Sequence, residues 1–343
     1  MIMADAFSKI IAHKGLTEME MSALMRGIMT GEASPAQIGG LLMGLAVKGE
    51  TVDEITGAAQ VMRELATPVN VGPEYLVDTC GTGGDGSTSF NISTTAALVV
   101  AAAGGRVAKH GNRAVSSRSG SADVLEAAGV HLQLLPEQVA RCIDTIGVGF
   151  LFAPRHHSAT RYAVAPRQEL GVRTLFNLLG PLTNPARAPN QVMGVYAQRW
   201  LRPLAEVLHR LGSRHVMMVH SEDGMDEISI SAATSVVEMR EGKISEYTIA
   251  PEDFGLSRAD RSLLHVASVQ ESLEKMKMGL QSGSGAISDI VALNAGAALY
   301  VSGVVLNLHD GVLLAQDVQA SGQASEKLRD LVAFTQIYAG QSS

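Results

Sequence analysis

The sequence contains few aromatic residues, little cysteine and a modest share of charge. Phe, Trp and Tyr make up 4% of its 343 residues, so the core must be built mainly from aliphatic side chains and methionine. Two cysteines, Cys80 and Cys142, provide neither a disulfide framework nor a metal-ligand spacing. Charged residues account for 18% and apolar residues for 46%, a balance that excludes a disordered chain and allows a sizeable core.

Long apolar runs and an excess of positive charge are also missing. The most apolar stretch, residues 96–103, is far shorter than the ~20 residues of a membrane-spanning helix. Residues 1–14 lack the basic-then-apolar layout of a signal peptide. A formal net charge of −7 argues against a general nucleic-acid or membrane-surface role. We therefore expect a cytoplasmic protein with no membrane partner and no nucleic-acid partner.

The first seventy residues carry helix signals and no convincing strand. An apolar stripe follows Thr17, Ser34-Pro35 opens a second helix, and Thr51 with Glu54 has the spacing of a capping box. Thr67-Pro68 breaks the pattern. These signals predict a small helical domain over residues 1–72.

From Tyr75 onward the pattern alternates between strands and helices. Residues 76–80 read as a buried strand, residues 93–103 as an Ala-rich helix that ends at Gly104-Gly105, and residues 106–108 begin a second strand. Such a βαβ unit implies parallel strands with a ligand site at their carboxyl ends. Further strands are predicted at 130–132, 148–152, 192–195 and 215–219, helices at 122–128, 136–145, 201–211 and 287–304, and a hairpin-like region from 229–230 and 235–239 that turns at 241–242.

Residues 166–189 interrupt this alternation. Pro181, Pro185 and Pro189 surround the segment from Asn177 to Asn184, which predicts an ordered loop or a crossing between domains around residues 165–190. The predicted fold is therefore α/β: a small N-terminal α-helical domain plus a larger α/β domain, residues 73–164 and 191–343, with a central, mainly parallel sheet.

A glycine-rich loop follows the first predicted strand. The run from Gly81 to Gly86 permits positive φ and lets backbone amides converge on an anion at a helix start. It matches neither a Walker A loop nor the Gly-x-Gly-x-x-Gly dinucleotide pattern. An ordinary glycine turn is the competing interpretation, but Asn91, Ser93 and Thr94 just beyond it favour a phosphate ligand. Asp85 adds negative charge, which suits sugar hydroxyls or a metal.

A second polar loop follows the second strand at the same edge of the sheet. Residues 109–113, Lys-His-Gly-Asn-Arg, place two cations beside a group of serines at 116, 117, 119 and 121. Compact positive charge with many hydrogen-bond donors is what a polyanion requires. A solvated basic turn is the weaker alternative, because the run directly follows the buried residues Val107-Ala108.

In their order along the chain, these motifs resemble those of the anthranilate phosphoribosyltransferase family. The resemblance extends to residues 173–177, 184–185, 220–227 and 294–298 and covers essentially the whole chain. It implies a nucleoside phosphorylase/phosphoribosyltransferase-like fold and transfer of the phosphoribosyl group of 5-phosphoribosyl 1-pyrophosphate (PRPP) to anthranilate, the second step of tryptophan biosynthesis from chorismate. It also implies Mg²⁺ as cofactor and a homodimer.

The resemblance assigns roles to particular residues. It implies PRPP binding by Gly81, Gly84, Asp85, Ser89, Asn91, Ile92, Ser93, Thr94, Lys109, His110, Gly111, Asn112, Arg113, Ala114, Val115, Ser116, Ser117 and Ser121. Gly81, Asn112 and Arg167 would contact anthranilate, and Ser93, Asp226 and Glu227 would help hold Mg²⁺. No general base is assigned: Lys109 would stabilise the leaving pyrophosphate, and His110 is the candidate proton acceptor.

These assignments have physical reasons and competing interpretations. Arg167 can pair with the anthranilate carboxylate through two hydrogen bonds, or it can form a surface pair with Glu169. Asp226-Glu227 offers the hard oxygen ligands that Mg²⁺ prefers, or it is an exposed strand entrance. Two positions depart from the family pattern, Ser158 in place of proline and Ser89 in place of threonine.

Two other functions stay open at this point. A pyrimidine nucleoside phosphorylase shares the architecture but typically adds a C-terminal domain for which this chain is too short. A nucleic-acid-binding module that kept the phosphate loops is the second alternative, and the acidic balance of the chain argues against it.

Overall fold

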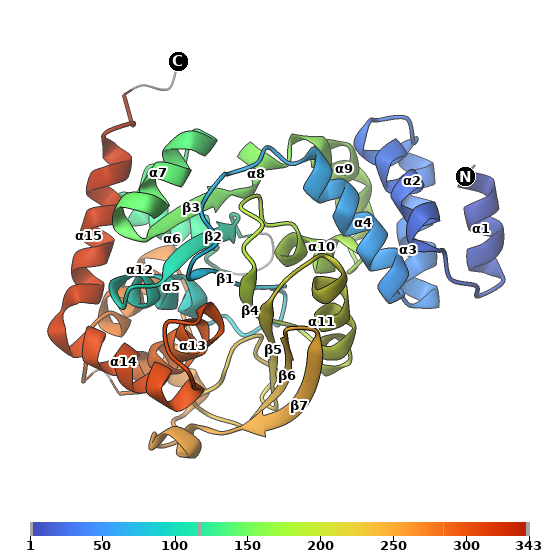
Figure 1. Ribbon diagram of the computed structural model, residues 1–343. Helices are drawn as coiled ribbons and strands as arrows, with labels where there is room; N and C mark the ends of the chain where they lie inside the picture. The colour runs from blue at the N-terminus through green and yellow to red at the C-terminus, as the bar shows by residue number, and fades with distance from the viewer. Residues whose placement is uncertain (1–2, 115–117, 284, 341–343) are drawn as a thin grey trace.

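The computed structural model describes residues 3–114, 118–283 and 285–340. A bundle of helices occupies one end of the molecule, and a β-sheet covered by further helices makes up the rest (Figure 1). Within the described residues, no helix is long and apolar enough to cross a membrane. The small helical unit and the larger α/β unit confirm the predicted fold class.

The N-terminal bundle consists of four helices, α1 (Met3–Ile11), α2 (Glu18–Met29), α3 (Pro35–Lys48) and α4 (Val52–Leu65). The hydroxyls of Thr17, Ser34 and Thr51 each accept a hydrogen bond from a backbone amide three residues later, at 3.3 Å. The side chain of that later residue bonds back to the first amide in each case, which completes three capping boxes. The three helix starts predicted from the sequence are therefore confirmed.

The sheet has seven strands in the order β3-β2-β1-β4-β5-β6-β7. The first five strands in this order run parallel, and the last two pairings, β5 with β6 and β6 with β7, are antiparallel. The strands are β1 (Leu76–Gly81), β2 (Arg106–Gly111), β3 (Val148–Phe152), β4 (Asn190–Gly194), β5 (His215–Ser221), β6 (Thr234–Arg240) and β7 (Lys243–Ile249). Because β1 lies between β2 and β4, the loops that follow these three strands emerge side by side.

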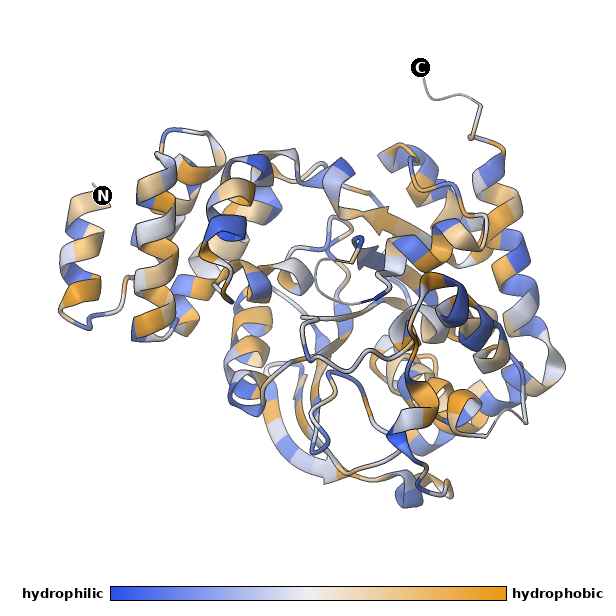
Figure 2. Ribbon diagram, turned by 180° about the vertical axis from the view of Figure 1, so that it is seen from behind, coloured by the Kyte–Doolittle hydropathy of each residue, from blue (hydrophilic) through white to orange (hydrophobic). Residues whose placement is uncertain are grey.

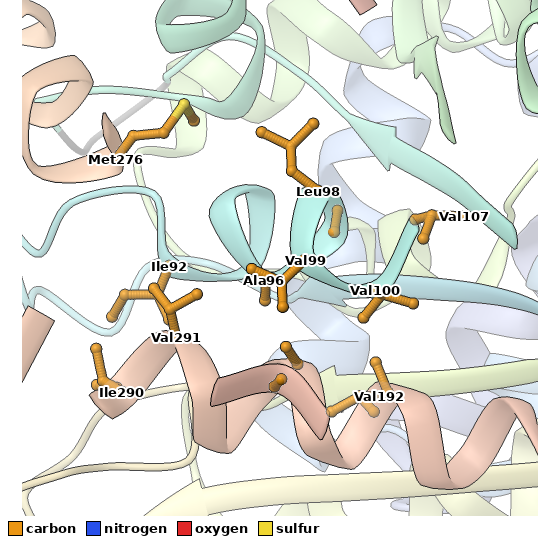
Figure 3. Packing of buried hydrophobic residues seen from close by; sticks show 14 of the residues in the cluster. Ile92, Ala96, Leu98, Val99, Val100, Val107, Val192, Met276, Ile290 and Val291 are labelled. Atoms are coloured by element: carbon orange, nitrogen blue, oxygen red, sulfur yellow. The ribbon is translucent and has the colours of Figure 1, made fainter. Parts of the chain in front are cut away.

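Alternation along the strands divides the core between the two faces of the sheet. Val192 and Met217 belong to the cluster built on α5 (Ile92–Ala102) and α13 (Ala286–Ser302), and Figure 3 shows Val192 facing these helices. Their neighbours Met193 and Met218 belong to the cluster shared by the bundle and α11 (Leu201–Arg210). The remaining helices of the α/β unit are α6 (Ser121–Ala127), α7 (Pro136–Ile146), α12 (Val269–Gly279), α14 (Leu308–Ser321) and α15 (Gln323–Gln336). Hydrophilic segments lie along the outward faces of the peripheral helices (Figure 2).

Two short strands predicted from the sequence do not form. Residues 130–132 lack strand structure, although Val130 and Leu132 are buried. The place beside β2 is taken by β3, which comes later in the chain. Residues 229–230 belong to a loop that leads into β6. At these positions the short apolar runs predicted burial of the side chains correctly, but their pairing as strands of the sheet wrongly.

The segment predicted as a loop between Pro166 and Pro189 is partly helical. It contains the second half of α9 (Arg161–Leu170) and all of α10 (Phe176–Leu182), with Pro166 and Pro181 inside them. A proline inside a helix costs about 3 kcal/mol. Burial of the apolar side chains of α9 and α10 in the core of the bundle offsets this cost. The boundaries predicted at residues 72, 164 and 191 stay predictions.

Candidate active site

The glycine loop lies between β1 and α5, at the carboxyl edge of the sheet. Gly83, Gly84 and Gly86 have φ values of +66°, +75° and +74°, which side chains with a Cβ rarely adopt. The amide of Thr82 donates to the carbonyl of Gly194 at 2.9 Å. The end of β4 therefore fixes the beginning of the loop.

An acidic loop, residues 222–228, lies against the glycine loop. The amide of Gly83 donates to Oδ2 of Asp226 at 2.8 Å, and the amide of Asp226 donates to Oδ2 of Asp85 at 3.3 Å. The amide of Ser93, at the start of α5, donates to Oε1 of Glu227 at 3.2 Å. The structure thus brings together Ser93, Asp226 and Glu227, which the sequence assigned to the metal, and places Asp85 beside them.

Two glycines make room for this acidic loop. A Cβ atom on Gly81 would overlap Oδ2 of Asp226, and a Cβ atom on Gly194 would overlap the carbonyl oxygen of Asp226. Both glycines end strands of the sheet, β1 and β4. The close approach of the carboxylate to the strand ends therefore depends on the missing side chains.

The carboxylates of the cluster repel one another. Burial raises the pKa of Asp226, and the nearby Asp85 raises it further. Burial and the charge of Asp226 raise the pKa of Glu227, whereas Lys109 opposes that shift. Carboxylate and hydroxyl oxygens suit Mg²⁺, which relieves such repulsion. Within the described ranges no three His, Cys, Asp or Glu side chains are placed to hold a metal alone, so substrate oxygens would complete the coordination.

Buried polar contacts set the position of the acidic loop. The carboxylate of Asp223 accepts hydrogen bonds from the hydroxyls of Ser221, Ser229 and Ser231 at 2.6, 2.8 and 2.6 Å. The side chain of Asn294, on α13, bonds the amide and the carbonyl of Ile228 at 3.0 and 2.9 Å. Both residues lie in motifs quoted for the resemblance, but their holding role was not predicted.

Lys109 reaches the same place from β2. Its side chain is 4% exposed, and its Nζ donates to the carbonyl of Thr79 and, at 3.3 Å, to Oγ of Ser93. Lys109 and His110 are part of the strand, which extends further than the predicted start at 106–108. The ammonium group of Lys109 therefore lies next to the predicted metal ligands, where it would face the negative charge of a bound diphosphate.

A buried carboxylate, Asp78, lies beneath the site and was missed in the sequence. It accepts hydrogen bonds from the amide of His110 at 3.2 Å and from Nδ2 of Asn184 at 2.7 Å. Burial raises the pKa of Asp78, and Lys109 opposes the shift. Asp78 thus joins β1, β2 and the crossing segment. The available signal was an acidic residue inside an otherwise apolar strand.

Two histidines form a neutral pair at the edge of the site. The rings of His110 and His157 lie 5.2 Å apart. Burial lowers the pKa of His110 well below its usual value and that of His157 to about 4. Nε2 of each ring is buried without a hydrogen-bond partner among the described residues. His156 ends the short helix α8 (Ala153–His156), and His157 follows it directly.

The loop after β2 is held by α6. Arg113 pairs with Glu126 at 2.7 Å and with Asp123 at 3.1 Å, so its charge is balanced by carboxylates. The hydroxyl of Ser121 donates to the carbonyl of Asn112 at 3.2 Å. Val115, Ser116 and Ser117, predicted to bind PRPP, lie outside the described residues.

Asn91 connects the two polar loops. Its Oδ1 accepts hydrogen bonds from the hydroxyls of Ser119 at 2.8 Å and of Ser272 at 2.7 Å. Asn91 directly precedes α5, at the N-cap position, but its side chain does not cap the helix. Asn91 therefore ties the start of α5 to the loop that follows β2.

Arg167 lies on α9, on the side of the crossing segment. Its guanidinium stands 4.9 Å from the ring centre of Phe176, and burial lowers its pKa. No ion pair joins it to Glu169 in the part of the chain that the structure describes. Its contact with anthranilate, like those of Gly81 and Asn112, stays a prediction.

Comparison with known proteins shows which family the chain matches. The helical bundle domain of the Glycosyl transferase family matches residues 4–66, and the a/b domain of that family matches residues 73–325. The anthranilate phosphoribosyltransferase of Thioalkalivibrio sulfidiphilus is 63% identical over 335 residues, which cover 98% of this chain and 99% of that protein. The one from Chromohalobacter salexigens is 60% identical over 339 residues, covering 99% and 98%.

Solved structures show the same likeness. The anthranilate phosphoribosyltransferase of Thermus thermophilus has a TM-score of 0.91 and 47% identity, over 97% of this chain and 99% of that one. The Saccharomyces cerevisiae enzyme, solved in complex with PRPP and Mg, has a TM-score of 0.88 and 23% identity over 98% of both chains. At that identity the yeast enzyme shows the shared fold.

Proposed function

The chain belongs to the anthranilate phosphoribosyltransferase family, and we propose that its reaction takes place where the loops after β1, β2 and β4 meet the acidic loop. The enzyme transfers the phosphoribosyl group of PRPP to anthranilate and releases pyrophosphate, a step of tryptophan biosynthesis. The observation that carries the location is the hydrogen bond between Gly83 and Asp226, which joins an anion-binding loop to a metal-binding loop.

PRPP lies, in this proposal, along the carboxyl edge of the sheet. The amides of the glycine loop and Lys109 face the diphosphate, and the polar residues of the loop after β2 face the 5-phosphate. Ser93, Asp226 and Glu227 would hold Mg²⁺, which neutralises diphosphate charge when bound. The oxygen-rich donor set and the raised pKa values of the two carboxylates support this placement.

The chemistry forms one bond and breaks another at C1 of the ribose. The amine nitrogen of anthranilate forms a bond to C1 as the bond from C1 to the pyrophosphate oxygen breaks, and the amine loses one proton. An aromatic amine is a weak nucleophile, so we propose a loose transition state with oxocarbenium character. Lys109 and the loop amides stabilise the negative charge on the leaving group. No strong base is required, and the low pKa of His110 fits a weak proton acceptor.

Anthranilate approaches from the side of the crossing segment. Arg167 and Asn112 would bind its carboxylate, and the neutral His110–His157 pair borders the aromatic ring. The stacked, half-buried guanidinium of Arg167 supports this role, because weak hydration strengthens pairing with a carboxylate. Closure of the bundle toward the α/β unit would shield the reacting carbon from water.

The assembly proposed for the enzyme is a cytoplasmic homodimer. Ile11, Met19 and Val47 are large apolar residues of the bundle region that stand 79%, 81% and 72% exposed. We propose that these side chains contribute to the contact between subunits. Sedimentation at several protein concentrations tests it, and a monomer throughout would refute it.

One assay tests the proposed reaction. Loss of anthranilate fluorescence is followed with PRPP and Mg²⁺, and the same protein is assayed for phosphate-dependent cleavage of uridine or thymidine. We expect turnover in the first assay and none in the second. Nucleoside cleavage without anthranilate consumption would establish the phosphorylase instead.

A further inference from the structure

Arg173 joins the crossing segment to the glycine loop. It lies just after α9, and its Nη2 donates a hydrogen bond to the carbonyl of Gly84. The face of the same guanidinium stacks on the ring of Tyr196, 4.2 Å from the ring centre. Arg173 therefore contacts the loop with its edge and a fixed aromatic platform with its face.

The platform is itself fixed from two sides. The amide of Tyr196 donates to the hydroxyl of Thr82 at 3.0 Å, and the hydroxyl of Tyr196 accepts from Nε1 of Trp200 at 2.9 Å. Trp200 is buried in the core shared by the bundle and α11. The Tyr196 platform under Arg173 is thus tied both to the start of the glycine loop, through Thr82, and to the core, through Trp200.

The hydrogen bond determines where the next amide points. In a planar trans peptide the C=O and the following N–H point in opposite directions. When the Gly84 carbonyl turns toward Arg173, the Asp85 amide turns the opposite way, away from the crossing segment. Gly83 and Gly84 both have positive φ and no Cβ. Their own backbone preferences therefore place little restriction on rotation of the Gly84–Asp85 peptide.

We propose that Arg173 is a positioning residue for the diphosphate of PRPP: it fixes the Gly84–Asp85 peptide so that the Asp85 amide, and not the Gly84 carbonyl, faces the ligand. The inference rests on the proposed function, because it takes the glycine loop as the diphosphate site. In this proposal two arginines of the crossing segment have different roles. Arg167 binds anthranilate, the acceptor substrate, and Arg173 positions the loop that binds PRPP, the donor substrate.

The test compares Arg173→Ala and Arg173→Lys with a control arginine that also stands over an aromatic ring. Arg199 stands over Trp200, which helps fix the platform, so the control that the readouts use is Arg240→Ala: Arg240 also stands over an aromatic ring, 5.9 Å from the centre of Tyr300, and has no contact with the platform. The readouts are kcat, the KM of each substrate, and calorimetric binding of pyrophosphate with Mg²⁺, which probes the diphosphate site without anthranilate.

For Arg173→Ala we expect the KM of PRPP and the Kd of pyrophosphate to rise about tenfold or more, because a charge-assisted hydrogen bond is lost. The KM of anthranilate should stay within about twofold of wild type. Arg173→Lys should fall between, since lysine can donate to Gly84 but cannot stack as a plane. Arg240→Ala should match wild type.

Other outcomes overturn the inference. Pyrophosphate affinity unchanged in a folded Arg173→Ala protein would do so, and so would equal rises in both KM values. Should Arg173→Ala fail to fold, Tyr196→Leu, which removes the platform, must weaken pyrophosphate binding in the same way. If wild-type protein binds pyrophosphate but does not consume anthranilate, the proposed acceptor substrate is wrong. The role of Arg173 is then decided by pyrophosphate binding to the variants.

Discussion

The carboxylate of Asp226 lies where a side chain on Gly81 would project. The acidic loop can therefore approach the end of β1 only because that strand ends in glycine. Many glycines in turns are required because of their positive φ, but Gly81 does not have positive φ. The structure instead gives close packing as the reason for glycine at this position.

Gly81→Ala should displace Asp226 and weaken Mg²⁺-dependent binding of PRPP. Overpacking of this kind costs about 1–3 kcal/mol, so the Mg²⁺ concentration for half-maximal activity should rise about tenfold. Gly39→Ala is the control, because a Cβ there meets nothing within 4 Å. An unchanged Mg²⁺ requirement in Gly81→Ala would contradict the role given to this contact.

Asp226→Asn should impair the metal site and keep its shape. The amide lacks the charge that attracts Mg²⁺, so activity titrated with Mg²⁺ should saturate at concentrations about tenfold higher or more. Glu222→Gln, in the same loop but exposed, should titrate like wild type. Identical Mg²⁺ curves for Asp226→Asn and wild type would remove Asp226 from the site.

The raised pKa values of Asp226 and Glu227 predict opposite effects of pH on metal binding and on stability. Protonation competes with Mg²⁺, so Mg²⁺ affinity should fall as the pH falls through neutrality. A carboxyl group whose pKa is raised on folding stabilises the folded chain when protonated, and this contribution is lost as the pH rises through the raised pKa. Without Mg²⁺, the stability of wild type relative to Asp226→Asn should therefore decrease with rising pH. Thermal unfolding of both proteins across this range, with and without Mg²⁺, checks both signs.

Arg167→Ala should weaken anthranilate more than PRPP. Loss of a charged pair with the substrate carboxylate should raise the KM of anthranilate about tenfold or more. The KM of PRPP should change little, because Arg167 lies on α9, on the acceptor side. Glu169→Ala on the same helix provides the control. Equal increases for both substrates would count against this role.

Asn184→Ala should destabilise the fold beneath the site. Nδ2 of Asn184 donates to Asp78 at 2.7 Å and to the carbonyl of Ala108 at 2.8 Å, and its removal leaves a buried carboxylate short of a donor. We expect the free energy of unfolding to drop by about 2–4 kcal/mol. Denaturant titration against Asn70→Ala, an exposed position, measures the difference, and a loss equal to the control would be evidence against the Asp78 network.

Local signals predicted the parts of this molecule that local chemistry determines. Capping residues located α2, α3 and α4, and the Gly81–Gly86 run predicted a loop with positive φ, because each depends on neighbours in sequence. Asp78 and Arg173 were missed since their partners, Asn184 and Gly84, lie far along the chain. The strand predicted at 130–132 was wrong because burial of Val130 says nothing about which edge of the sheet is free.

The bundle of α1–α4 is completed by residues made much later. Its core includes Ala163 of α9, Leu182 of α10 and Leu204 of α11, and Arg63 of α4 bonds the carbonyls of Leu182 and Leu211. On the ribosome, the first four helices therefore emerge with apolar faces that stay uncovered until the chain beyond β4 has been synthesised. The packing of the N-terminal unit therefore ends late in synthesis, and its apolar faces are exposed in the partly made chain until then.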